Sequence, residues 1–353
     1  MIEQSTVLVL GAGASMPYGY PSGAQLRQLL IDEVLFGRAV EMGLIRGEDV
    51  RNFCEVFRYS GMSSIDAFLA RRGHHKTQSG SVTFDVVGKL GIALALRKRA
   101  TLGGLFHKWM EQEGDHTDTA DNWYEYLWGR LTDGVSKRNI REFGENRLQV
   151  ITFNYDTSLE QYLFTALRNS YGLGEIDAME QLSRIPIHHV YGRLTLGAHA
   201  LCPHQIAYGV GGMDLIADDA DGIQVIDEER DQSVPVLDAC EKLLRDAQKI
   251  VFLGFGFDKV NVRRLRVAEV LKARYATQLA SANGSAPNVF CTTLGMTHWQ
   301  RKQVRDSLFS GLTDLSPRYP GIALHYHEAA LNDLGKYADC KSLKLLQSTG
   351  ALG

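Results

Sequence analysis

The sequence predicts an α/β fold in which helices flank a mostly parallel sheet, and three observations favour this class. An apolar strand, 6–10, runs directly into a glycine-rich turn. Further short segments rich in β-branched or aromatic residues recur along the chain, and helical patterns separate several of them, as crossover helices do in a parallel sheet. The later strand candidates are 148–153, 187–191, 250–254, 288–293 and 322–326.

The glycine-rich turn has the sequence Gly-Ala-Gly-Ala-Ser, and a helical pattern begins near Gln25. This order presents backbone N–H groups and the positive end of a helix to an anion, usually a nucleotide pyrophosphate. The spacing departs from the dinucleotide pattern G-x-G-x-x-G, because Met16 stands at the third glycine and the next glycine is Gly19. We therefore predict a Rossmann-like nucleotide-binding domain. Its first contacts are expected from Gly11, Ala12, Gly13, Ala14 and Ser15.

The residues between this turn and Asn154 show few strand signals but much helical periodicity, including 84–109 and 123–131. Because the block is too long for a crossover, we expect a helical insertion that stands over the mouth of the sheet as a lid. A second glycine turn at 254–256 is expected to open a long helix near Asn261. The predicted divisions are a Rossmann-like domain at 1–35 and 145–330, a helical insertion at 36–144, and a C-terminal helix and tail at 331–353.

The composition is that of an ordinary globular protein, with 44% hydrophobic and 22% charged residues among 353. A net charge of −3 provides no basic field for phosphate neutralisation, so no direct nucleic-acid partner is expected. The basic run 71–76 is interpreted as a solvated loop. The N-terminus lacks a basic leader, and no apolar stretch approaches the ~20 residues of a membrane helix. The sequence therefore predicts a cytoplasmic protein with no membrane partner.

The cysteines are scattered and odd in number, which favours reduced thiols over a disulfide framework. No C-x-x-C pair occurs, which excludes a four-cysteine zinc ribbon. His199, Cys202 and His204 provide three neighbouring ligand types without a fourth, so no metal is expected. The five cysteines are Cys54, Cys202, Cys240, Cys291 and Cys340.

Three features in a fixed order carry a family resemblance. Pro21 follows the glycine turn, T-F-N-Y-D stands at 152–156, and I-H-H-V-Y-G stands at 187–192. Together they resemble the sirtuin-like (silent-information-regulator-like) family, whose members bind NAD⁺ and cut its nicotinamide–ribose bond. The resemblance covers 1–35 and 145–310. It implies that NAD⁺ is the substrate, that Asn154 is catalytic and that Asp156 helps to hold nicotinamide.

The same resemblance implies that the second glycine turn receives the adenosine half of NAD⁺. Asp258 is interpreted either as a ribose ligand or as the cap of the next helix. Asp66 lies in a stretch similar to one early in the helical insertion of bacterial relatives, and its alternatives are a buried cleft residue and a first-turn charge. The residues implied at the adenosine side are Gly254, Phe255, Gly256, Asp258 and Asn261.

Asn154 also has a chemical argument of its own. It follows a strand at the carboxyl edge, where open α/β sheets bind their ligands. A neutral amide can hydrogen-bond a ribose hydroxyl or an attacking water without adding charge beside an oxocarbenium-like transition state. The structural alternative makes Asn154 a helix N-cap and Asp156 a first-turn charge.

The expected base is His189. Neighbouring residues of a strand face opposite sides, so only one of His188 and His189 can point into the site. His189 shares its face with Tyr191, and Tyr191–Gly192 stands where family members commonly have His-Gly. The alternatives are His188, Tyr191, and a core histidine satisfied by the backbone.

Two departures from protein deacylases of the family make deacylation a minor alternative. Ser22 follows Pro21 where those enzymes have P-D-F-R, and the zinc cysteines are missing. The chain instead resembles the sirtuin-like NADases of bacterial antiphage systems, which deplete cellular NAD⁺. The resemblance implies gating by homo-oligomerisation or by a partner such as a hexameric DNA-translocase-type ATPase. A non-catalytic sensor of NAD⁺ or ADP-ribose is the main alternative.

Overall fold

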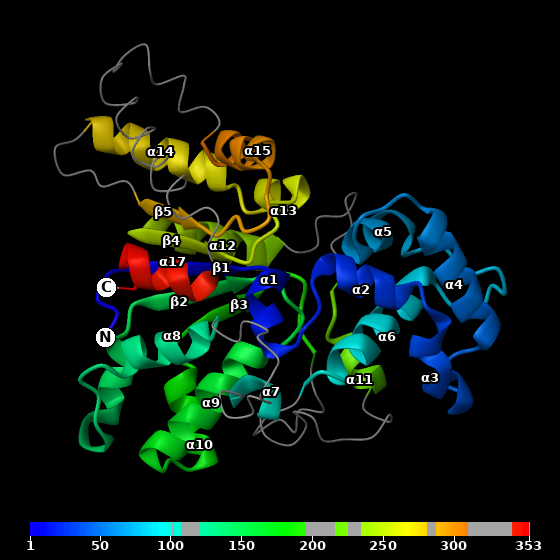
Figure 1. Ribbon diagram of the computed structural model, residues 1–353, viewed down its shortest axis with the longest axis horizontal. Coiled ribbons are helices and arrows are strands. Elements are labelled where there is room, and N and C mark those ends of the chain that lie inside the picture. The colour runs from blue at the N-terminus through cyan, green and yellow to red at the C-terminus, as the bar shows by residue number, and fades with distance from the viewer. Residues whose placement is uncertain are drawn as a thin grey trace, which may run out of the picture.

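A computed structural model describes residues 1–100, 102–106, 121–194, 216–224, 234–280, 287–309 and 341–352. Within these ranges five parallel strands form one sheet in the order β3-β2-β1-β4-β5 (Figure 1). Helices flank the sheet, so the predicted α/β class with a Rossmann-like parallel sheet is confirmed. The strands are β1 (Thr6–Leu10), β2 (Leu148–Thr152), β3 (Ile187–His189), β4 (Lys249–Leu253) and β5 (Asn288–Cys291).

The sheet grows outward from β1, whose five residues are all buried. Such a continuous apolar strand is stable only where both faces of the sheet are covered. Leu10 pairs with Thr152 of β2 on one side and with Leu253 of β4 on the other. Strand order therefore reverses between β1 and β4, and the turns that leave these two strands meet at the carboxyl edge, the usual ligand position of such sheets. The strand candidate at 322–326 lies outside the described residues.

The helices differ from the sequence prediction at one place near this edge. The prediction of one long helix from Asn261 is wrong. Two helices, α13 and α14, stand there, because Arg266 between them has a left-handed backbone with φ 51°. The α-helices are α1 (Ala12–Ser15), α2 (Gly23–Leu30), α3 (Gly37–Glu41), α4 (Gly47–Tyr59), α5 (Ile65–Arg72), α6 (Phe84–Arg97), α7 (Leu102–Phe106), α8 (Trp123–Thr132), α9 (Ser158–Tyr171), α10 (Glu175–Leu182), α11 (Ile216–Asp221), α12 (Val234–Asp246), α13 (Lys259–Arg264), α14 (Val267–Ala280), α15 (His298–Leu308) and α17 (Ser342–Thr349). In the described ranges, 3-10 helices span Met16–Tyr18, Glu33–Phe36 and Lys137–Glu145.

Helices α2 to α6 form a separate lobe beyond the carboxyl edge of the sheet (Figure 1). Its centre is aromatic, since neighbouring rings among Phe53, Phe57, Phe68 and Phe84 have centroids 4.7–6.3 Å apart. Helix α8 lies away from this lobe and packs against α9 and α17. The helices of 36–144 are therefore shared between the lobe and the sheet domain.

Polar contacts between described residues join the lobe to the sheet domain. Tyr155, just after β2, donates its hydroxyl to the Asp66 carboxylate of α5. Arg97 of α6 forms an ion pair with Asp219 of α11, and both side chains are buried. Because α11 is bound back to the chain after β3 through the bridge between Gly192 and Ile223, the lobe is connected to the edge of the sheet.

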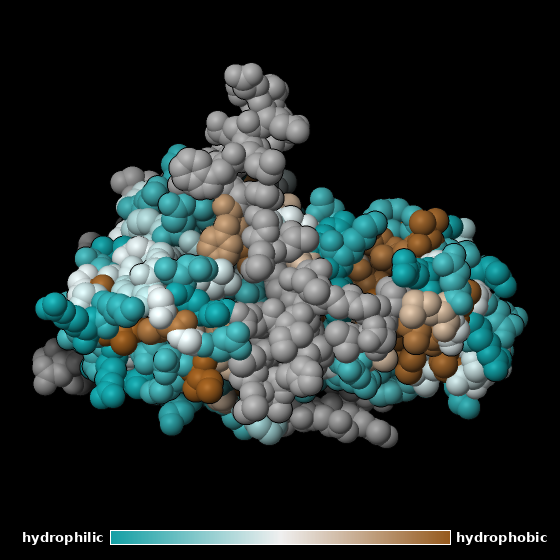
Figure 2. All heavy atoms as spheres, turned by 90° about the horizontal axis from the view of Figure 1, so that it is seen from below, coloured by the Kyte–Doolittle hydropathy of each residue, from teal (hydrophilic) through white to brown (hydrophobic). Residues whose placement is uncertain are grey.

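The lobe also carries exposed apolar side chains, which Figure 2 shows as brown areas at its right. Val34 is 83% exposed and Met42 is 49% exposed. No helix in the described ranges combines the length and apolar composition needed to cross a bilayer.

Candidate functional site

The two glycine turns lie back to back at the carboxyl edge. Gly254 has a left-handed backbone with φ 56°, and a Cβ placed there would lie 2.0 Å from the amide nitrogen of Ala14. The Gly13 amide donates to the Gly254 carbonyl oxygen at 3.0 Å, and the Ala14 amide donates to the Gly11 carbonyl oxygen at 2.9 Å. The glycines are therefore required by contact between the turns. These two amides are already engaged, so the turn offers fewer free donors to a diphosphate than the sequence prediction implies.

Asn154 lies directly against the first glycine turn and is only 8% exposed. Its side-chain Nδ2 donates to the Gly11 carbonyl oxygen and to the Ser15 hydroxyl, both at 3.0 Å. A carbonyl oxygen only accepts, so the atom facing Gly11 must be the amide nitrogen. The opposite atom, Oδ1, accepts no hydrogen bond from the described residues. Asn154 thus presents a fixed and unused acceptor.

Asp156 extends the same hydrogen-bond chain. The Ser15 hydroxyl donates to Asp156 Oδ1 at 3.2 Å, and Oδ1 also accepts from the amide of Ser158 at 3.1 Å and from its hydroxyl. The other oxygen, Oδ2, has no partner among the described residues. Asp156 rather than Asn154 therefore supports the start of α9, and the interpretation of Asn154 as an N-cap is wrong.

The stability of the protein should depend on the ionisation of Asp156. Burial raises the pKa of this carboxyl above its ordinary value of 3.8, so the native state binds the proton more tightly than the unfolded chain does. The contribution to stability is present at low pH and is lost as pH rises from 3.8 through the raised native pKa. Asp156→Asn keeps the Oδ1 acceptor without the charge. Its stability relative to wild type, from urea unfolding between about pH 4 and pH 7, should increase with pH. Parallel curves would contradict the raised pKa.

The imidazole side chain of His189 is buried, with 6% of its surface exposed, and both of its ring nitrogens have partners. Nδ1 lies 2.9 Å from the backbone carbonyl oxygen of Asn154, and Nε2 lies 2.6 Å from Oε1 of Glu160 in α9. Arg193 approaches the same carboxylate oxygen at 3.8 Å. The structure therefore brings His189 to Asn154, as expected for one site, but through the backbone of Asn154 and with no ring nitrogen free. Nothing in the spacing of Glu160 from the T-F-N-Y-D segment indicated this contact.

Tyr191 does not share the surroundings of His189, so that expectation is wrong. Strand β3 ends at His189, and the chain then turns through Gly192 with φ 68°, which breaks the alternation of faces. The Tyr191 hydroxyl donates to Asn261 Oδ1 and accepts from Arg264 Nη1 at 2.7 Å. Burial is the largest cause that raises the pKa of Tyr191. The tyrosine is thus tied to α13 as an uncharged hydrogen-bonding group.

Helix α8 supports the first glycine turn in a way that the sequence pattern did not reveal. The Trp123 indole N–H donates to the Ala14 carbonyl oxygen at 2.8 Å. The Tyr124 hydroxyl lies 2.6 Å from the Ser158 hydroxyl and so continues the chain that leads to Asn154. The Tyr124 ring also stacks on Tyr18 at 3.8 Å. Periodicity identified this helix, but only the tertiary structure shows that it holds the site.

Replacing Trp123 by Phe should destabilise the protein by about 1–2 kcal/mol, because the buried carbonyl of Ala14 loses its donor while an aromatic ring remains. Urea unfolding measures this loss. Trp128→Phe is the matched control, since the ring of Trp128 packs on Phe143 and its indole makes no hydrogen bond in the described part of the chain. Equal destabilisation of both variants would show that ring size, not the hydrogen bond to the glycine turn, is the cause.

The remaining site candidates have structural surroundings that leave their predicted roles open. Pro21 is buried. Phe255 is buried against Phe153, with ring centroids 5.1 Å apart. Asp258 caps α13, accepting from the Val260 and Asn261 amides, which agrees with the capping interpretation. The adenosine role of this turn stays a prediction.

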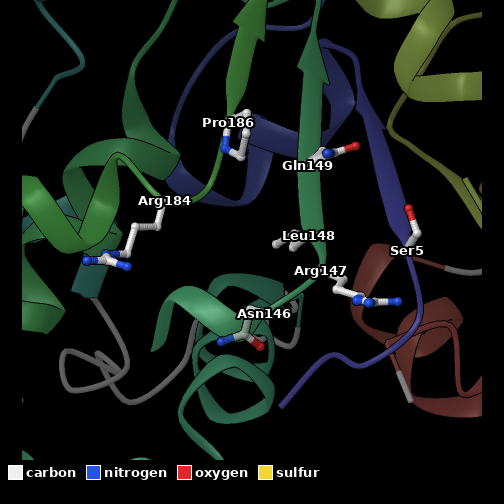
Figure 3. A pocket seen from close by; sticks show the side chains of 7 residues that line it. All are labelled: Ser5, Asn146, Arg147, Leu148, Gln149, Arg184 and Pro186. Carbon is white, nitrogen blue, oxygen red and sulfur yellow. The ribbon is translucent and has the colours of Figure 1, made fainter. Parts of the chain in front are cut away.

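Two further observations concern parts of the described structure away from this polar cluster. No group of three or more His, Cys, Asp or Glu side chains there is arranged to hold a metal ion, and His199, Cys202 and His204 lie outside those residues. A hollow of about 410 Å³ lies at the opposite, amino edge of the sheet (Figure 3). It contains none of the predicted site residues. Its lining is Ser5, Asn146, Arg147, Leu148, Gln149, Arg184 and Pro186.

Strand order and paired glycine turns thus define a Rossmann-like α/β protein with a polar cluster at the switch point of its sheet. Neither the models of known protein families nor the curated proteins give a match to this chain. Function is therefore inferred from the residues of the site.

Proposed function

We propose that this protein is an NAD⁺ glycohydrolase that cleaves the nicotinamide–ribose bond to release nicotinamide and ADP-ribose. The supporting observation is a pair of acceptors that have no partner among the described residues, Asn154 Oδ1 and Asp156 Oδ2, held by one hydrogen-bond chain beside the switch point. The hydroxyls of ribose and the carboxamide NH₂ of nicotinamide are donors, so these acceptors complement the reacting half of NAD⁺.

In the proposed reaction the bond between C1′ of the ribose and the pyridine nitrogen breaks, and its electron pair stays on that nitrogen. Nicotinamide therefore leaves as a neutral molecule. Water donates an electron pair to C1′ and loses a proton to solvent, which completes ADP-ribose. The positive charge that develops on the sugar is stabilised by a preorganised amide oxygen, and Asn154 Oδ1 accepts a hydrogen bond from the water or from a ribose hydroxyl. His189 is the base proposed from sequence, but to act as one it must first release a ring nitrogen from its present partner.

The biological role proposed with this activity is depletion of NAD⁺ in antiphage defence, and it rests on the family resemblance of the sequence. An ungated NADase is toxic to its host, so homo-oligomerisation or a partner such as a DNA-translocase-type ATPase is proposed as the control. No metal ion has a part in the proposed chemistry.

The test is direct. Purified protein, alone and after concentration to promote self-assembly, is incubated with NAD⁺, and nicotinamide and ADP-ribose are separated by chromatography. We expect equal amounts of the two products. Calorimetry with NAD⁺ runs in parallel. Saturable binding of intact NAD⁺ without products in any of these conditions would replace the enzyme by a sensor, and the absence of both binding and products would contradict the proposal altogether.

A further inference from the structure

Glu160 and His189 form a buried pair beside the catalytic candidate. Their side chains are 5% and 6% exposed, and Oε1 of Glu160 lies 2.6 Å from Nε2 of the ring. Charged or potentially charged groups are buried so completely only when they are paired and hydrogen-bonded. The pair reaches the site through the backbone of Asn154, whose carbonyl oxygen lies 2.9 Å from Nδ1 of His189.

The hydrogen positions in this pair follow from the partners. The carbonyl oxygen of Asn154 can only accept, so Nδ1 of His189 carries a hydrogen and donates it. One further proton lies between Nε2 and Oε1 of Glu160. It is bonded either to the ring nitrogen or to the carboxyl oxygen. In either case the ring has no lone pair left for water, which a general base requires.

The same contacts fix Asn154 at three points. Its amide nitrogen donates to the Thr152 hydroxyl at 3.1 Å, its carbonyl accepts from His189, and its side-chain nitrogen binds the glycine turn. A group held this way keeps its free oxygen in one direction, which is what preorganised stabilisation of a transition state demands.

We infer that Glu160 and His189 are positioning residues that hold the backbone of Asn154, and that His189 does not serve as the general base. This inference rests on the proposed function. The proton of the attacking water then leaves to solvent, which is chemically adequate because the leaving group departs neutral and needs no prior proton transfer.

The decisive comparison is His189→Asn against His189→Ala. The side-chain NH₂ of asparagine occupies the place of Nδ1 and can donate to the Asn154 carbonyl, but it cannot take up a proton. A positioning role predicts kcat within about tenfold of wild type for His189→Asn and a loss of about 10² or more for His189→Ala. A base role predicts that both variants lose about 10²–10⁴, and this result overturns the inference.

Variants of Glu160 provide a second comparison, which can be made even if the His189 variants fold poorly. Glu160→Gln can donate its amide to Nε2 while Nδ1 keeps its hydrogen, so kcat should stay within about tenfold, whereas Glu160→Leu leaves Nε2 buried without a partner and should lose about 10². Equal, severe losses in both variants, with unfolding curves like wild type, would show that the carboxylate charge supports a base. His298→Ala, an exposed histidine of α15, is the control.

Failure of the proposed function is recognised separately, since wild type then releases no nicotinamide. In that case the protonation of Nδ1 of His189 tests the inference. Selectively ¹⁵N-histidine-labelled protein should show one ring with a protonated Nδ1 bound to a carbonyl, and this signal should vanish in His189→Asn. An unprotonated Nδ1 at His189 overturns the inference whatever the activity.

Discussion

Asn154→Ala is expected to lower kcat for nicotinamide release by about 10²–10³, the usual effect of removing one preorganised hydrogen-bonding group from a transition state. The oxygen that is lost is Oδ1, which accepts no hydrogen bond from the described residues. Binding of NAD⁺ should change much less, because the residues proposed to contact its diphosphate and adenosine are unchanged. Steady-state release of nicotinamide, with binding measured by calorimetry, separates the two effects.

The variant also removes one of the two donors of the Gly11 carbonyl and the donor to the Ser15 hydroxyl, which should cost about 1–2 kcal/mol of stability. Assays are therefore run well below the unfolding transition. Asn169→Ala is the matched control: Asn169 is exposed on α9, and within the described part of the chain its amide bonds only the Thr165 carbonyl, so kcat should not change. Full activity of Asn154→Ala would refute the catalytic assignment, even if the protein proves to be an NADase.

Gly254→Ala is expected to destabilise the protein by about 3 kcal/mol or more and to abolish ligand binding. A methyl group here would lie 2.0 Å from the Ala14 nitrogen and 2.2 Å from the Gly13 carbonyl carbon, both backbone atoms that cannot rotate away. Overpacking costs about 1–3 kcal/mol, and the left-handed backbone adds about 1–2 kcal/mol for a residue with Cβ. The unfolding midpoint in urea measures the sum.

Gly256→Ala is the control, two residues along the same turn. A Cβ at Gly256 meets nothing within 4 Å, and its φ does not lie in the left-handed range. Its stability should remain within about 0.5 kcal/mol of wild type. If Gly254→Ala unfolds at the same urea concentration as Gly256→Ala, the two turns do not pack as described.

Much of this site was predictable because its polar residues directly follow the ends of strands. The apolar run of β2 places Asn154 and Asp156 at the carboxyl edge, where parallel strands bring their ends together. The role of His189 was harder to predict, since alternation of faces holds only while a strand continues, and β3 ends at that residue. Trp123 and Glu160 were not predicted at all. Their partners lie 109 and 29 residues away in sequence, and periodicity reports only the face that a helix buries.

By itself the sequence determined the α/β class, the five described strands and the polar segment after β2, because burial and local backbone preferences are properties of neighbouring residues. The tertiary structure alone decided that the two turns pack so closely that each needs glycine. It also decided that His189 hydrogen-bonds to Glu160 and that Tyr191 hydrogen-bonds to α13. These contacts depend on which distant groups complete a buried hydrogen bond, and on where two backbones approach too closely to leave room for a Cβ atom. Those conditions arise only when the chain is folded.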